Sequence, residues 1–180
     1  MTGTDRPMSP LAVLVPDRGT VRAVVERSYR AGREEMWTAL TRPERLCGWL
    51  GVLTGEMAPG GTYRLAFGDG DDEVVTGTVL TCEPPARLVV TWVLPDGHET
   101  EVEVALEEDA DGTTLRLEHR GLPGESAHGY AAGWHVHLDD LRSMLAGAEP
   151  AGTWAERFAE LLPAYRNAST SSGTASRSTS

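Results

Sequence analysis

The sequence lacks three common amino acids and is poor in cysteine. Its 180 residues include no lysine, isoleucine or glutamine, and Asn167 is the single asparagine. Because every basic residue other than histidine is an arginine, we attribute the arginine content to the codon usage of a high-GC bacterium and give it no functional meaning. Cys47 and Cys82 are too few for a disulfide framework, and their spacing matches no zinc motif. We therefore expect a reducing, cytoplasmic environment.

Long hydrophobic runs and excess positive charge are also absent. The longest early apolar run, Leu11 to Val15, is too short for a signal-peptide core or a membrane span. The mature protein is therefore expected to begin near Met1 and to stay soluble. A formal net charge of −11 produces a surface that repels phosphate backbones and anionic lipid. Nucleic acid and membranes are not expected as partners.

The standard signatures of enzymes are missing as well. The chain has no G-x-S-x-G, P-loop, dinucleotide-binding glycine motif or H-E-x-x-H. The acidic segments 69–74 and 107–112 lack the ligand order of a calcium loop, so we interpret both as solvated turns. We assign no catalytic residue, no metal ligand and no cofactor.

What is present is a regular order of elements. Alternating apolar residues predict a strand over 21–29, and two short helices follow at 33–40 and 43–50. A long helix is predicted from about 125 to 146, followed by an amphipathic stretch at 153–166. Between the short helices and the long helix lies a ladder of antiparallel strands, predicted at 60–67, 73–83, 87–94, 99–107 and 113–119.

This order predicts an α+β domain. Short turns at 68–70, 95–97 and 111–112 favour a meander, and its apolar face needs the long helix as a cover. We expect a curved antiparallel sheet wrapped around the long C-terminal helix, with the two short helices after the first strand. The expected segments are a partly disordered N-terminal extension at 1–20, a domain at 21–147, an additional amphipathic helix at 148–167 and a disordered tail at 168–180.

Two histidines and two aspartates crowd the segment GWHVHLDDLRSML, residues 133–145. A helix turns about 100° per residue, so His135 and His137 point in nearly opposite directions and cannot share a metal. We expect His135 and Asp139 to lie on a solvated polar face. The core-facing stripe comprises Trp134, Leu138, Leu141 and Leu145, with Tyr130 beside it.

Three polar side chains remain ambiguous at this stage. His137 lies at the edge of the apolar stripe, and His119 shares the inward side of its strand with Leu115 and Leu117. Each is either a structural hydrogen-bonding residue or a polar anchor within a pocket. Arg27 points inward if strand alternation continues to Tyr29, and outward if a bulge intervenes, which we favour.

Several quoted motifs together resemble a known family. WTALT at 37–41, followed by Pro43-Glu44, Leu46 and Trp49, resembles the two-helix signature of the activator of heat-shock-protein-90 ATPase homologue-like family. The resemblance covers about residues 21–147 in the right order. The further matching motifs are Gly60-Gly61 with Tyr63-Arg64, Gly77-x-Val79, Glu83-Pro84-Pro85, Leu88-Val89 with Thr91-Trp92, Leu117-x-His119-x-Gly121-Leu122, and Gly133-Trp134 with the helical leucines.

This resemblance implies the helix-grip fold of the START-like, SRPBCC superfamily. It implies a deep cavity between the long helix and the sheet, open near the two short helices, that holds a small hydrophobic molecule. Tryptophans on inward faces suit such a pocket, although for any single one of them we favour a place in the core. The expected ligand-binding residues are Trp49, Tyr63, Phe67, Trp92, His119, Tyr130, Trp134, His137, Leu138 and Leu141.

Three functions follow from these observations. The leading hypothesis is non-catalytic binding of the hydrophobic ligand. The second is a cyclase, aromatase or hydrolase that uses His119 and His137 as acid and base. The third is a chaperone-associated interaction module, although residues 1–20 leave no room for the activator's additional N-terminal domain. The segment 153–166 is expected to dock on the body, to cap the cavity or to form a homodimer contact.

Overall fold

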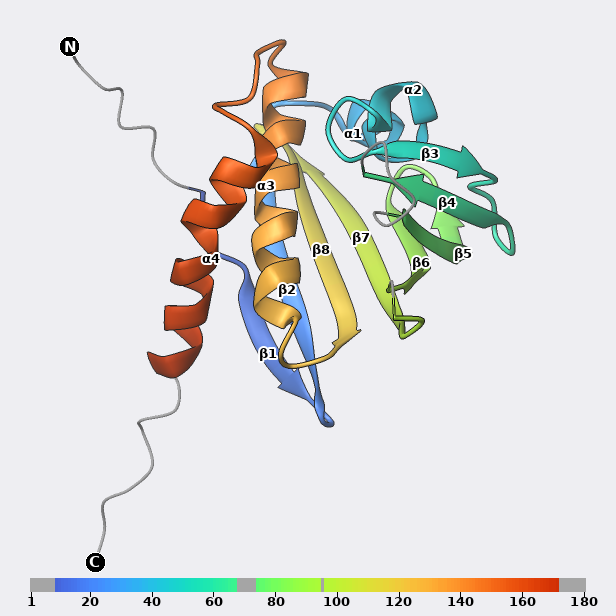
Figure 1. Ribbon diagram of the computed structural model, residues 1–180. Coiled ribbons are helices and arrows are strands. Elements are labelled where there is room, and N and C mark those ends of the chain that lie inside the picture. Colours follow the sequence, from blue (N-terminus) through green and yellow to red (C-terminus); the bar gives the residue numbers. More distant parts are fainter. Residues whose placement is uncertain (1–8, 68–73, 95, 172–180) are drawn as a thin grey trace, which may run out of the picture.

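The computed structural model describes residues 9–67, 74–94 and 96–171, and its centre is one eight-stranded antiparallel sheet. The sheet curves around helix α3, as Figure 1 shows. In the order in which they lie side by side, the strands are β1 (Val13–Asp17), β2 (Thr20–Tyr29), β8 (Gly112–Leu122), β7 (Glu99–Asp109), β6 (Arg87–Val93), β5 (Val74–Glu83), β4 (Thr62–Ala66) and β3 (Val52–Gly55).

The predicted meander is confirmed. Strands β3 to β8 are paired in chain order, and β8 then pairs with β2. At one turn of the meander, the Asp109 carboxylate accepts hydrogen bonds from the backbone N–H groups of Asp111 and Gly112. The two edge strands, β1 and β3, were not predicted. Both are short, with few inward side chains, so they carry little of the period-two pattern that identifies a strand.

Within the described residues, four helices accompany the sheet: α1 (Arg33–Thr41), α2 (Pro43–Leu46), α3 (Ala127–Leu145) and α4 (Trp154–Ser171). The prediction for α2 was too long, because the helix ends at Leu46 and the chain turns through Gly48 toward β3. A Cβ at Gly48 would lie 2.9 Å from Met144 Sδ, so a glycine permits the close approach of this turn to α3. No helix in the described residues has the length and apolarity needed to cross a membrane.

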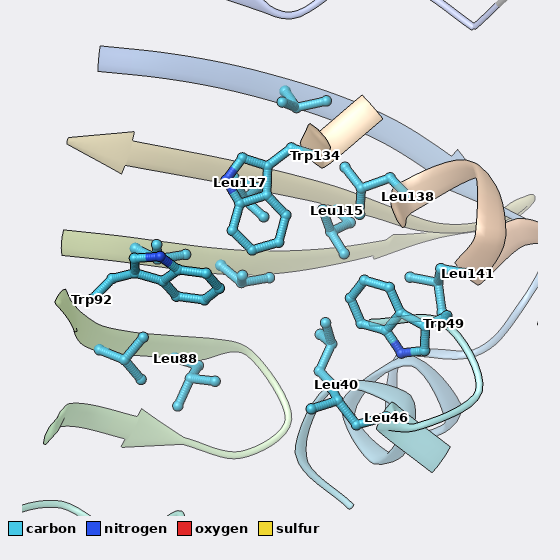
Figure 2. Packing of buried hydrophobic residues seen from close by; sticks show 14 of the residues in the cluster. Leu40, Leu46, Trp49, Leu88, Trp92, Leu115, Leu117, Trp134, Leu138 and Leu141 are labelled. Atoms are coloured by element: carbon cyan, nitrogen blue, oxygen red, sulfur yellow. The ribbon is translucent and has the colours of Figure 1, made fainter. Parts of the chain in front are cut away.

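The core lies between α3 and the concave face of the sheet. Trp134, Leu138 and Leu141 form the predicted stripe and are buried against β8, where Leu115 and Leu117 are also buried. Figure 2 shows these side chains together, with Trp49 reaching the same core from the segment after α2. The Tyr29 hydroxyl donates to the carbonyl of Leu138 over 3.0 Å and fastens α3 to β2. The α+β prediction of a sheet around a long helix is confirmed.

Arg27 lies on the inward side of β2, so the outward orientation that we favoured was wrong. The bulge in β2 lies between Val21 and Ala23, and alternation is regular from there to Tyr29. The Arg27 side chain is 3% exposed, and one of its guanidinium nitrogens donates to the carbonyl of Glu26. Burial lowers the pKa of Arg27, and the nearby carboxylate of Asp139 opposes this effect.

The prediction of a solvated face at His135 and Asp139 was also wrong. Helix α4 packs beside α3 (Figure 1), and its Tyr165 covers this face. His135 is fully buried, with Nδ1 2.9 Å from the Tyr165 hydroxyl and Nε2 3.5 Å from Asp139. The same hydroxyl accepts a hydrogen bond from the backbone N–H of Ala12. The polar residues of this face thus join three segments of the chain.

Some expectations fall outside the described residues. These are residues 1–8 of the predicted N-terminal extension, the turn at 68–70, most of the acidic segment 69–74, Pro95 of the turn at 95–97, and the end of the predicted tail at 172–180. Helix α4 continues to Ser171, so the first residues of the segment predicted as a disordered tail are helical.

Candidate functional site

A cleft of about 1200 Å³ opens between α3, α4, the segment after α2 and the β4–β5 hairpin. Its volume lies above the roughly 300–1,000 Å³ usual for small-molecule sites, so it has room for a ligand of several rings. Nine of the side chains around it are aromatic or imidazole rings: Trp49, Phe67, Trp92, His128, Tyr130, Trp134, His137, Trp154 and Phe158.

Six of the ten residues expected to bind a ligand border this cleft. They come from four different parts of the chain, which strand alternation and helical periodicity bring to one place. Trp92 on β6 and Trp134 on α3 have ring centroids 5.3 Å apart, and Figure 2 shows the two indoles facing one another between sheet and helix. The six are Trp49, Phe67, Trp92, Tyr130, Trp134 and His137.

The other four expected residues do not border the cleft. Leu138 and Leu141 are fully buried between α3 and the sheet. Tyr63 lies across Gly77 of β5, and its hydroxyl donates to the carbonyl of Thr91 over 2.7 Å. His119 is buried behind Trp92 and Trp134. These residues support the wall of the cleft instead of presenting a surface to it.

His119 is held as a neutral imidazole by two hydrogen bonds. The Thr100 hydroxyl donates to the carbonyl of Trp92 over 2.7 Å, so it accepts from His119 Nε2 at 2.8 Å. Nδ1 accepts from the indole N–H of Trp134 over 3.1 Å. Burial lowers the pKa of His119 to about 3. With both nitrogens occupied, this ring orients Trp134 and has no free position for proton transfer to a ligand.

His137 occupies a different environment, although it lies one turn along the same helix from Trp134. Its Nδ1 donates to the backbone carbonyl of Trp49 over 3.1 Å, which links α3 to the segment after α2. The Trp49 indole in turn donates to the carbonyl of Ala39, so this segment is tied to α1 as well. Burial lowers the pKa of His137, while the hydrogen bond to Trp49 and the charge of Asp140 partly oppose that shift.

Sequence analysis missed two aromatic residues of the cleft, Trp154 and Phe158. Both lie on the first turns of α4, and their rings stack at 4.7 Å with an interplanar angle of 14°. Trp154 also lies 5.6 Å from the ring of His137. The amphipathic stripe of 153–166 was the available signal, but a stripe does not identify the surface on which a helix docks. Docking on the body is observed, and the same helix forms a wall of the cleft.

Charged groups lie at the rim of the cleft. Arg157 on α4 forms an ion pair with Asp140 on α3, with the two atoms 2.6 Å apart and both side chains largely buried. Glu125 and Arg166 also line the cleft. Opposite charges therefore balance near the aromatic walls, and the interior favours a neutral ligand.

Comparison with known proteins agrees with this fold and geometry. The family model described as "Activator of Hsp90 ATPase homolog 1-like protein" matches residues 30–146. The chain belongs to this family. The helix-grip fold of the START-like, SRPBCC superfamily, which the sequence motifs implied, is thereby confirmed. No curated protein gives a significant match.

Similar solved structures include CalU16 from Micromonospora echinospora. Its crystal structure has a TM-score of 0.71 and 29% identity, covering 87% of this chain and 92% of that one. Its solution structure has a TM-score of 0.74 and 26% identity, covering 93% and 99%. DynU16, described as a putative protein in the dynemicin biosynthetic locus, has a TM-score of 0.66 and 32% identity, covering 77% of this chain and 51% of that one.

Proposed function

We propose that this protein binds a small hydrophobic aromatic molecule in the cleft and performs no chemistry on it. The observation that carries the proposal is the concentration of aromatic rings around an open volume of about 1200 Å³. Flat apolar walls of this kind bind aromatic ligands by burial and ring contacts. Membership of this family and likeness to DynU16, which is described as a putative protein in a biosynthetic locus, support a ligand-binding role.

The geometry favours binding over acid–base catalysis by a histidine pair. Such catalysis would need His119 and His137 to reach one substrate. His119 lies behind the cleft wall with both ring nitrogens bonded, whereas His137 borders the cleft. The interaction-module alternative has less support, because the exposed large apolar residues of the described chain lie on separate elements: Val13, Val52, Leu80 and Trp154.

Filling the cleft with a new side chain tests the proposal. Gly129 borders the cleft on α3, and a Cβ built there meets no atom within 4 Å. We expect Gly129→Trp to place an indole in the open volume and to weaken binding of 2-methoxynaphthalene, a neutral two-ring probe, at least about tenfold. Isothermal titration calorimetry measures the change in Kd.

Gly124→Trp is the matched control. Gly124 also has open space around its Cβ, but it precedes α3 and does not border the cleft. This variant should bind the probe as the wild type does. Equal affinity of the wild type and Gly129→Trp would contradict binding in the cleft, and so would an absence of saturable binding to the wild type.

A further inference from the structure

Of the two ring nitrogens of His137, only Nδ1 makes a hydrogen bond within the described residues. Because a carbonyl oxygen only accepts hydrogen bonds, the contact with Trp49 requires the proton to be on Nδ1. In the neutral ring, Nε2 is then a hydrogen-bond acceptor with a fixed position. No described residue donates to Nε2, and the partly exposed ring borders the cleft. The acceptor is therefore open to a ligand.

The surroundings of this acceptor are aromatic. Phe67 lies 5.7 Å from the His137 ring centroid, and Trp154 lies 5.6 Å from it, with interplanar angles of 38° and 39°. Trp134 approaches the same ring edge-on at 6.4 Å. A ligand that reaches Nε2 must therefore place its own rings among these three side chains, with a hydrogen-bond donor at its edge.

The charges nearby indicate a neutral donor. Asp140 and Arg157 are the ionisable groups that influence His137, and they neutralise one another in an ion pair. The net charge of −11 further disfavours an anionic ligand. A phenolic hydroxyl is a neutral group of this kind, since it donates one hydrogen bond from the edge of an aromatic ring.

We propose that His137 Nε2 is a specificity determinant that selects phenolic aromatic ligands, an inference that rests on the proposed binding function. The Nδ1 contact with Trp49 holds the ring so that Nε2 accepts from the ligand hydroxyl. Aromatic molecules without a donor bind the same walls but lack this hydrogen bond. The cleft therefore discriminates between phenols and their methyl ethers.

The decisive comparison uses 2-naphthol and 2-methoxynaphthalene, which share a ring system but differ in the donor. Wild type should bind 2-naphthol about fivefold more tightly, the factor typical of one neutral hydrogen bond. His137→Asn keeps an amide N–H for the Trp49 carbonyl but has no acceptor in the place of Nε2. It should bind both probes with equal affinity, so the ratio of the two Kd values falls from about five to about one. His137→Gln, whose longer side chain can place an oxygen near that position, should retain part of the preference.

The outcomes separate this inference from the function on which it rests. If wild type binds both probes with equal affinity, ligand binding stands and the specificity role of His137 is overturned. If His137→Asn keeps the fivefold preference, the donor is recognised elsewhere and the inference is again wrong. If wild type binds neither probe, the proposed function fails and takes the inference with it.

Discussion

His119 illustrates how two hydrogen bonds decide the role of a single residue. Its place on the inward side of β8 was predictable from strand alternation, but its function was not. The choice between structural support and pocket anchor depends on Thr100 and Trp134, which are 19 and 15 residues away in the chain. The bonds to these residues fix a neutral tautomer and turn the indole of Trp134 toward the cleft. Sequence periodicity gives the side of a strand but no such partners.

The buried neutral His119 makes stability depend on pH. Because the folded-state pKa is lowered to about 3 from 6.5, the unfolded chain binds the proton first as pH falls. Its contribution is present above pH 6.5 and is lost toward pH 3. Between pH 7 and pH 5 this residue should remove about 2 kcal/mol from the free energy of unfolding.

Urea unfolding of wild type and His119→Gln at both pH values measures this contribution. The variant lacks the titrating ring, so its loss between pH 7 and pH 5 should be smaller by that amount. The difference between the two proteins removes the effect of carboxylates and other histidines, which are common to both. An identical loss would show that His119 is not held neutral.

At the scale of elements, β5 shows how a glycine shapes the sheet. Gly77 is paired with Tyr63 on β4, and the tyrosine ring crosses the strand at that point. A Cβ at Gly77 would lie 2.0 Å from the carbonyl oxygen of Thr91 and 2.7 Å from the Tyr63 ring. Since a backbone oxygen cannot yield as a flexible side chain does, the position requires glycine.

Gly77→Ala should therefore lower the free energy of unfolding by about 3 kcal/mol, the upper range for overpacking. Thermal or urea unfolding checks the value. Gly129→Ala is the matched control, because a Cβ at this position meets no atom within 4 Å. Since alanine has a higher helix propensity than glycine, this variant should be more stable than the wild type by up to about 1 kcal/mol. If Gly77→Ala is as stable as the wild type, the packing described around Gly77 is wrong.

The elements differ in how far the sequence determined them. Strands β4 to β8 and helix α3 carry long periodic patterns and were predicted to within a few residues. The edge strands β1 and β3 bury few side chains, and their pairing depends on neighbours distant in the chain. Helix α2 ends at Leu46, and Gly48 then lies close to Met144 of α3, a tertiary contact that local propensity does not encode.

At the scale of the whole molecule, one hydroxyl joins the N-terminal segment, α3 and α4. Tyr165 is 1% exposed, and its oxygen accepts from Ala12 N–H at 2.8 Å and lies 2.9 Å from His135 Nδ1. This arrangement holds α4 where Trp154 and Phe158 form a wall of the cleft. Six cleft residues were expected from inward-facing patterns together with the family resemblance, but this wall was not, because docking of α4 is a long-range contact.

Tyr165→Phe should leave the Ala12 amide and the His135 ring without their partner. Burying such groups unpaired costs about 2 kcal/mol in the free energy of unfolding. Amide hydrogen exchange should be faster at Ala12 and along α4, while exchange in the central strands β7 and β8 stays slow. Tyr130→Phe, at the partly exposed edge of the cleft, is the control and should change neither quantity. Unchanged exchange in Tyr165→Phe would show that the hydroxyl does not hold α4.

Native mass spectrometry of the purified protein tests directly whether the cleft holds a ligand. The sample is compared before and after denaturation, and again after incubation with 2-naphthol. We predict an excess mass on the folded chain, from a copurified molecule or from one bound 2-naphthol, that disappears on denaturation. The mass of the chain alone in every sample, including the one incubated with the probe, would contradict the account.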